Sequence, residues 1–187
     1  LTADITTANN TSKTLYQNSA GTIVTIAQTG NPSTGLAARG ATYYSTTGTA
    51  PNQVVLAAPV KYWQVEVNTV GYKNATISSD QISSATGPKD FKLQYSSTGP
   101  LGVFTDLVST ITLNSSTWNT TAVNNVALPA SCQNNPNVVL RWAQTSFLNV
   151  SSVEMTTTGG TNKIDNILVR GEKLDAVNTF SVTGTTS

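Results

Sequence analysis

The chain of 187 residues is long enough to bury one sizeable core, although only 10% of its residues are charged. Its net charge of +1 and scattered basic residues give no electrostatic footprint, so we expect neither nucleic acid nor a membrane as partner. The chain has no histidine and a single cysteine, Cys132, which excludes Ser-His and Cys-His catalysis, cysteine-based metal clusters and a disulfide within the chain.

Thr, Ser, Asn and Gly take the place of the missing charged residues, so the surface is expected to be polar without being ionic. Such a surface is typical of secreted or cell-surface β-proteins, and we expect an extracellular or cell-surface location. The longest apolar runs, such as 54–58, fall far short of the ~20 residues that a membrane span requires. We expect one monomeric domain over 1–187, cut from a longer polypeptide, in which 172–187 is either a closing strand or a linker to other domains.

The first forty residues are the least regular part of the pattern. Ile23, Val24 and Ile26 predict one strand, which ends at the turn residues 30–32. A second short strand is predicted over 41–44. The segments 31–40 and 45–53 are rich in residues that tolerate tight turns and are predicted to be loops.

The segment 61–95 predicts three antiparallel strands. Trp63, Val65 and Val67 alternate with polar residues, as do Phe91 and Leu93, and 74–83 alternates in the same way. Turn signals at 70–71 and 86–88 separate the three runs. Each strand should therefore carry one apolar and one polar face.

The remaining chain predicts further strands separated by turns. The runs 103–107 and 109–123 predict two further strands, 128–137 predicts a loop with room for a short helix, and 138–147 predicts a longer strand. In the last strand, 163–171, Ile164, Asn166 and Leu168 should lie on the face opposite to Asp165 and Ile167.

Turn signals recur about every 8 to 12 residues, the spacing typical of sandwiches and jelly rolls. The predicted fold is therefore all-β, an antiparallel β-sandwich of the jelly-roll type. Trp63, Phe91 and Trp142 share the apolar phase of their strands, so we predict that they form the core.

The order of several motifs resembles a known group. The motifs are YWQVEVNTVGYKNATIS, SSATGPKDFKLQYSSTG with FTDL, Trp118 and the terminal KIDNILVRG. From Tyr62 to Gly171 the chain resembles the jelly-roll carbohydrate-binding modules of bacterial extracellular and cell-surface glycoside hydrolases, with family 54 modules of cell-surface glucanases as the specific candidate. The resemblance implies polysaccharide binding and a structural calcium near the closing strand.

Sugar recognition needs flat apolar faces together with planar amides, carboxylates or guanidinium groups. If 138–144 lies in the same sheet as 62–68 and 91–95, one polar face carries Tyr62, Gln64, Glu66, Lys92, Gln94 and Arg141. That row is the predicted ligand site. The alternative is an ordinary solvated sheet face.

Aromatic side chains in turn-rich segments are further candidates for contact with a ligand. Tyr72 and Trp118 are predicted ligand residues, and Tyr43 and Tyr44 are weighed with them, although adjacent residues of a strand point to opposite faces. The alternative is that these rings only cover an edge of the sandwich.

The metal prediction depends on the resemblance, which places Asp165 at a calcium-binding position; Asp4, from the opening segment of the chain, is the weaker predicted partner. Calcium prefers such hard oxygen ligands. The alternative is that Asp165 caps a turn or pairs with Lys163 or Arg170.

The favoured function is a non-catalytic carbohydrate-binding module that targets a parent enzyme to a polysaccharide of the β-glucan or xylan class. The competing function is a structural or adhesive surface module that binds protein or spaces other domains. A small glycan-active enzyme ranks last, because no spacing supports a carboxylate pair such as Glu66 with Glu154 or Asp106.

Overall fold

The computed structural model describes residues 61–155 and 160–174, together with Asn31 and the strand backbone at 3–4, 16–18, 26–29, 36–41, 46–47 and 54–55. The strands before residue 61 are β1 (Ala3–Asp4), β2 (Tyr16–Asn18), β3 (Ile26–Thr29), β4 (Leu36–Ala41), β5 (Thr46–Thr47) and β6 (Val54–Val55). The later elements are β7 (Lys61–Val67), β8 (Tyr72–Ser83), β9 (Asp90–Ser96), β10 (Thr105–Thr112), β11 (Val126–Ala127), the 3₁₀ helix η1 (Ala130–Cys132), β12 (Val138–Gln144) and β13 (Thr161–Lys173).

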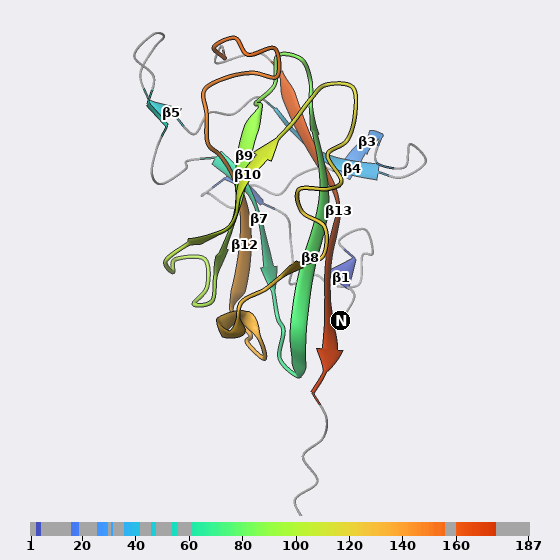
Figure 1. The fold of residues 1–187 in the computed structure, drawn as a ribbon, viewed down its shortest axis with the longest axis vertical. Helices are drawn as coiled ribbons and strands as arrows, with labels where there is room; N and C mark the ends of the chain where they lie inside the picture. The colour runs from blue at the N-terminus through green and yellow to red at the C-terminus, as the bar shows by residue number, and fades with distance from the viewer. Residues whose placement is uncertain are drawn as a thin grey trace, which may run out of the picture.

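These strands form two antiparallel sheets, which confirms the predicted all-β sandwich (Figure 1). The first sheet has the order β11-β8-β13-β4-β3, and β1 also pairs with β13. The second sheet has the order β10-β9-β12-β7-β2, and β5 pairs with β6 separately. The long neighbours β8 and β13 form the middle of the first sheet, and β12 lies between β9 and β7 in the second.

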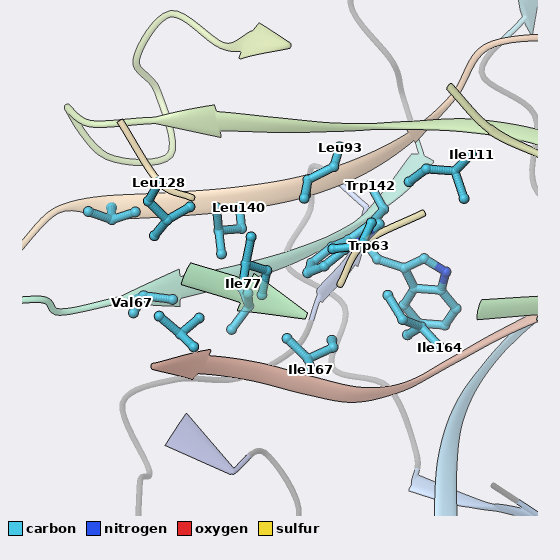
Figure 2. Packing of buried hydrophobic residues seen from close by; sticks show 14 of the residues in the cluster. Trp63, Val67, Ile77, Leu93, Ile111, Leu128, Leu140, Trp142, Ile164 and Ile167 are labelled. Carbon is cyan, nitrogen blue, oxygen red and sulfur yellow. The ribbon is translucent and has the colours of Figure 1, made fainter. Parts of the chain in front are cut away.

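The core lies between the two sheets, and both contribute to it (Figure 2). Trp63 on β7 is directly opposite Trp142 on β12, and both are fully buried, as is Phe91. The prediction that these three aromatic residues form the core is confirmed. Ile77 and Ile164 meet them from the first sheet.

Polar atoms tie the two sheets together inside this core. The indole Nε1 of Trp63 donates to Asn162 Oδ1 at 2.6 Å, and the indole Nε1 of Trp142 donates to Ser79 Oγ at 3.1 Å. Asn162 and Ser79 belong to β13 and β8 of the first sheet. The two tryptophans therefore join the layers through hydrogen bonds as well as through apolar packing.

Three predictions about strands are wrong. The predicted loop 45–53 contains β5, a short strand that pairs with β6. The predicted loop 31–40 contains β4, which pairs with β13. The two strands predicted within 103–123 are one strand, β10, which has register shifts against β9 and ends at Thr112. It ends there because Asn114 Oδ1 accepts hydrogen bonds from the backbone N–H groups of Ser116 and Thr117, an Asx-type turn that diverts the chain.

The predicted alternation along the last strand is also wrong at one point. Ile164 and Ile167 are both buried although they are three positions apart. Asn166 lies between them with a φ of 48°, and the register against β8 shifts between Asp165 and Leu168. This bulge moves the chain by one residue and reverses the faces beyond it.

Other predictions agree with the structure or lie outside the described residues. The turn at 70–71 is confirmed, with Gly71 at a φ of 80°, and η1 is the short helix that the loop 128–137 had room for. The strand predicted around Ile23 is described only from Ile26 onward, as β3. Tyr43, Tyr44 and the segment 175–187 lie outside the described residues.

Candidate functional site

The outer face of the second sheet holds the row of polar residues that the sequence predicts. The register places Arg141 of β12 between Gln64 of β7 and Gln94 of β9. Ala143, in the same phase as Arg141, lies between Tyr62 and Lys92. Glu66 completes the face, opposite Val139. The condition for this row, that β12 shares a sheet with β7 and β9, is therefore met.

The middle of this outer face is buried rather than solvated. The exposed fractions of Tyr62, Gln64 and Gln94 are only 8%, 6% and 5%. An ordinary wet sheet face is thus the wrong description at these positions. The outward-facing Val139 and Ala143 of β12 are buried as well, so this face also has an apolar component.

Arg141 is the best-fixed charge on this face. Its guanidinium carbon lies 3.5 Å from the centroid of the Phe104 ring and 5.0 Å from that of Tyr62. Its Nε and Nη2 donate to the Gln94 side-chain oxygen at 3.2 and 2.8 Å. Burial lowers the pKa of Arg141, while Tyr62 and Asp106 act in the opposite direction. Stacking and hydrogen bonding together fix the plane of the guanidinium.

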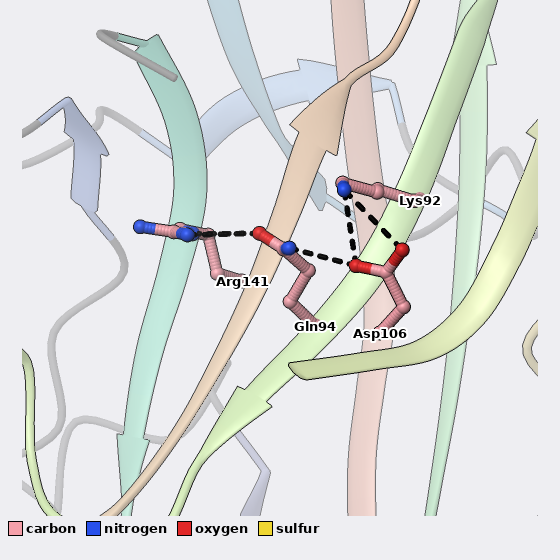
Figure 3. A network of polar contacts seen from close by, with 4 residues as sticks. All are labelled: Lys92, Gln94, Asp106 and Arg141. Atoms are coloured by element: carbon pink, nitrogen blue, oxygen red, sulfur yellow. Dashed lines mark hydrogen bonds and ion pairs between the residues drawn. The ribbon is translucent and has the colours of Figure 1, made fainter. Parts of the chain in front are cut away.

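The row continues from Gln94 to β10 (Figure 3). Gln94 Nε2 donates to Asp106 Oδ1 at 2.7 Å, and Lys92 Nζ lies 3.0 Å from the same oxygen. Burial raises the pKa of Asp106, but hydrogen bonds from Gln94 and Lys92 and the positive charges of Lys92 and Arg141 outweigh it and hold the pKa below 3.8. The result is a connected polar array across three strands, which we call the Arg141 array: Arg141, Gln94, Asp106 and Lys92.

Sequence reasoning did not place Phe104 or Asp106 in this site. Asp106 was considered only as a catalytic acid, although its pairing with Gln94 puts it on the outer face. Phe104 ends the connection between β9 and β10, so its position over Arg141 depends on the path of that loop. No periodic signal could have predicted this contact.

The two remaining predicted ligand residues lie elsewhere. Tyr72 begins β8 and pairs with Lys173 in the first sheet. Trp118 lies in the loop after β10, next to Asn119, which bridges to Gln81 of β8. Both side chains are partly exposed, but neither belongs to a strand of the second sheet, so the structure does not bring them to the Arg141 array.

Asp165 lies in a second cluster, at the bulge of β13. It is paired directly with Asp80 of β8. Asp165 Oδ2 accepts the backbone N–H of Asn31 at 2.7 Å, and Asp165 Oδ1 accepts that of Asn166 at 2.8 Å. Asp80 Oδ2 accepts the side-chain amides of Asn31 and Asn166 at 2.8 and 2.6 Å. Asp165 thus caps backbone groups, as one of the alternatives proposed, and it also faces a second carboxylate.

This cluster offers only hard oxygen ligands to a cation. It has two carboxylates and the main-chain oxygen of Asn31, which accepts a hydrogen bond from Asn166 Nδ2 at 2.6 Å. If the side-chain amides of Asn31 and Asn166 were rotated by half a turn, their two oxygens would join the set. Such a set fits calcium. Across the described residues, no group of three or more His, Cys, Asp or Glu side chains could hold a metal, so amide and main-chain oxygens would have to complete the site. Asp4 is placed only by its backbone, opposite Leu168.

Comparison of the chain with protein-family models, curated proteins and solved structures gave no match. No helix within the described residues is long and apolar enough to cross a membrane.

Proposed function

We propose that this chain is a non-catalytic, extracellular or cell-surface carbohydrate-binding module that holds a parent enzyme on a polysaccharide of the β-glucan or xylan class. The observation that supports the proposal most is the Arg141 array beside two aromatic rings. Sugar hydroxyls both donate and accept hydrogen bonds. A row with amide, carboxylate, ammonium and guanidinium groups contains both the acceptors and the donors that such hydroxyls need. Phe104 adds an apolar ring at the edge of the array.

Pre-organisation is the physical advantage of this arrangement. The four side chains hold one another through hydrogen bonds of 2.7 to 3.3 Å and one ion pair, so a ligand would not have to order them. Affinity for a single sugar would still be modest, because the groups are partly satisfied within the chain. Attachment to a polymer with many repeats raises the effective concentration of the parent enzyme near its substrate.

A structural calcium is the second part of the proposal. Asp80 and Asp165 are the residues that would hold it, with oxygens of Asn31 and Asn166, and it would neutralise two carboxylates that face each other across neighbouring strands. Because the ion would join β8 and β13, the melting temperature of the chain should fall when a chelator is added. Asp80→Asn should reduce that fall, and an identical melting temperature with and without chelator would refute the calcium site.

Affinity electrophoresis tests the binding function. The isolated chain should be retarded in gels that contain soluble polysaccharides such as laminarin, neutral xylan and glucuronoxylan, relative to a gel without polymer. Gln94→Ala should reduce the retardation, because Gln94 joins Arg141 to Asp106. The matched control is Gln133→Ala, since among the described residues the Gln133 side chain bonds to backbone groups of the loop after β11 and of Ala75, away from the Arg141 array. Unchanged mobility across the whole panel would end this proposal.

One observation favours the competing function, a surface module that binds protein. Leu101 and Val103, in the loop between β9 and β10, have exposed fractions of 101% and 85%. Exposed apolar side chains next to each other are frequent in protein contacts. If a Leu101→Ser, Val103→Ser double variant loses attachment to cells while it still binds polysaccharide, the loop has this role.

A further inference from the structure

The Arg141 array has two positive groups, Arg141 and Lys92, and one negative group, Asp106. Lys92 and Asp106 form an ion pair, with Nζ and Oδ1 3.0 Å apart. Among the described residues, no carboxylate bonds to Arg141, whose hydrogen bonds go to the neutral side-chain oxygen of Gln94 and to the side chain of Tyr62. Glu66 lies on the same face, opposite Val139 rather than Arg141. The surplus cation is therefore at the β7 end of the array.

The surroundings of Arg141 disfavour its positive charge. A guanidinium that is half-buried between two rings has lost part of its hydration. Burial lowers the pKa of Arg141, which indicates that the charged form is disfavoured there. An anion that reaches the guanidinium would recover this energy, whereas a neutral hydroxyl would recover less of it.

The guanidinium also has the right edge for such an anion. Gln94 uses the edge formed by Nε and Nη2. The remaining nitrogen, Nη1, points away from Gln94 (Figure 3), so the edge formed by Nη1 and Nη2 lies on the side opposite that contact. Two parallel N–H groups match the two oxygens of a carboxylate, and the rings of Phe104 and Tyr62 hold the guanidinium plane in place.

We propose that the outer face of the second sheet selects a uronate-bearing polysaccharide, with the sugar carboxylate bound by the outward edge of Arg141. This inference rests on the proposed carbohydrate-binding function and narrows its ligand from neutral β-glucans and xylans to acidic ones, of which glucuronoxylan is the nearest example. The hydroxyls of the sugar would then meet the partly exposed Asp106 and Lys92, while the buried Gln94 holds Arg141 and Asp106 in position.

The test compares glucuronoxylan with the same polymer after reduction of its carboxyl groups, and with laminarin. The chain should bind glucuronoxylan about tenfold or more tightly than the reduced polymer, because one charge-assisted, two-point contact is lost. Arg141→Gln and Arg141→Lys should both abolish this preference, since lysine keeps the charge without the fork. Glu66→Gln removes an anion from the same face and should strengthen binding to glucuronoxylan.

Arg170→Gln is the matched control, because Arg170 is exposed on β13 of the first sheet and its replacement changes the net charge by the same amount. Equal binding of native and reduced polymer would overturn the inference and leave the carbohydrate-binding function intact. Equal weakening by Arg170→Gln and Arg141→Gln would also overturn it, because the attraction would then depend only on net charge. If Arg141→Gln fails to fold, Arg141→Lys and the comparison of the two polymers still decide.

Discussion

The buried side chain of Asn162 should be one of the largest single contributors to stability in this chain. Asn162 is fully buried on β13, and its Oδ1 accepts from Trp63 Nε1 at 2.6 Å and from Gln81 Nε2 at 3.0 Å. Its Nδ2 donates to the main-chain oxygen of Ile82 and to Ser83 Oγ at 3.0 and 2.9 Å. Asn162→Ala therefore removes one of the two described tryptophan links between the sheets and leaves the other, Trp142 to Ser79, in place.

The magnitude follows from the groups that lose their partner. Trp63 Nε1 and Gln81 Nε2 are buried donors, and each donor left unpaired costs about 1–3 kcal/mol. The Gln81 side-chain oxygen already has no hydrogen-bond partner, so loss of the Asn162 contact takes away the hydrogen bond of the amide nitrogen as well. With a small cavity in addition, Asn162→Ala should lower the free energy of unfolding by about 3–5 kcal/mol.

Urea unfolding followed by circular dichroism measures this loss without using tryptophan as the reporter. The control is Asn124→Ala, an exposed loop position where the change should stay within about 0.5 kcal/mol. In a double-mutant cycle with Trp63→Phe, the two changes should couple by about 1–2 kcal/mol, because each removes one end of the same hydrogen bond. A loss below about 1 kcal/mol, or strictly additive changes, would refute the reasoning.

Two further predictions concern the outer face of the second sheet. Gln64→Met should raise the free energy of unfolding by up to about 1 kcal/mol, because Gln64 Oε1 is buried without a hydrogen-bond partner and Met keeps the volume; a loss of stability in urea unfolding would contradict this. Asp106→Asn should cost about 0.2–1 kcal/mol near neutral pH, since the Asp106–Lys92 pair is partly exposed, with 45% and 26% of the side chains accessible. The pKa of Asp106 is lower in the folded protein than in the unfolded chain, so its stabilisation is present above pH 3.8 and is lost as the pH falls through the folded pKa. The free energies of unfolding of the two proteins should therefore converge in acid. A difference that stays constant across pH would count against the role assigned to Asp106.

The sequence predicts best those strands whose two faces differ strongly. β7 and β9 are read correctly because Trp63, Val65 and Leu93 alternate with polar residues, and one face of each strand is in the core. β4 is missed because its sequence, LAARGA, resembles a loop and its place depends on pairing with β13. A strand that is defined by its neighbour rather than by its own pattern needs the tertiary structure.

The two candidate sites also differ in how far the sequence predicts them. The row on the second sheet follows from alternation once β12 is placed between β7 and β9, so Gln94 and Arg141 could be grouped from sequence. The pairing of Asp80 with Asp165 could not, because it depends on the register of β8 against β13 and on the bulge at Asn166. A strict period of two would also have placed Ile167 on the wrong face.

The position of Arg141 is determined by the core beneath it. Its neighbours Leu140 and Trp142 are fully buried on the opposite face of β12, and the strand has hydrogen-bonded partners on both sides, β7 and β9. Because adjacent residues of a strand point to opposite faces, the packing of Trp142 against Trp63 fixes the backbone from which Arg141 projects. Changes at the partly exposed outer residues Lys92 and Asp106 should therefore alter binding with little effect on folding, whereas changes at Trp142 should alter both. One face of β12 thus packs in the core of the sandwich, and the other carries the residue that the proposed ligand would meet.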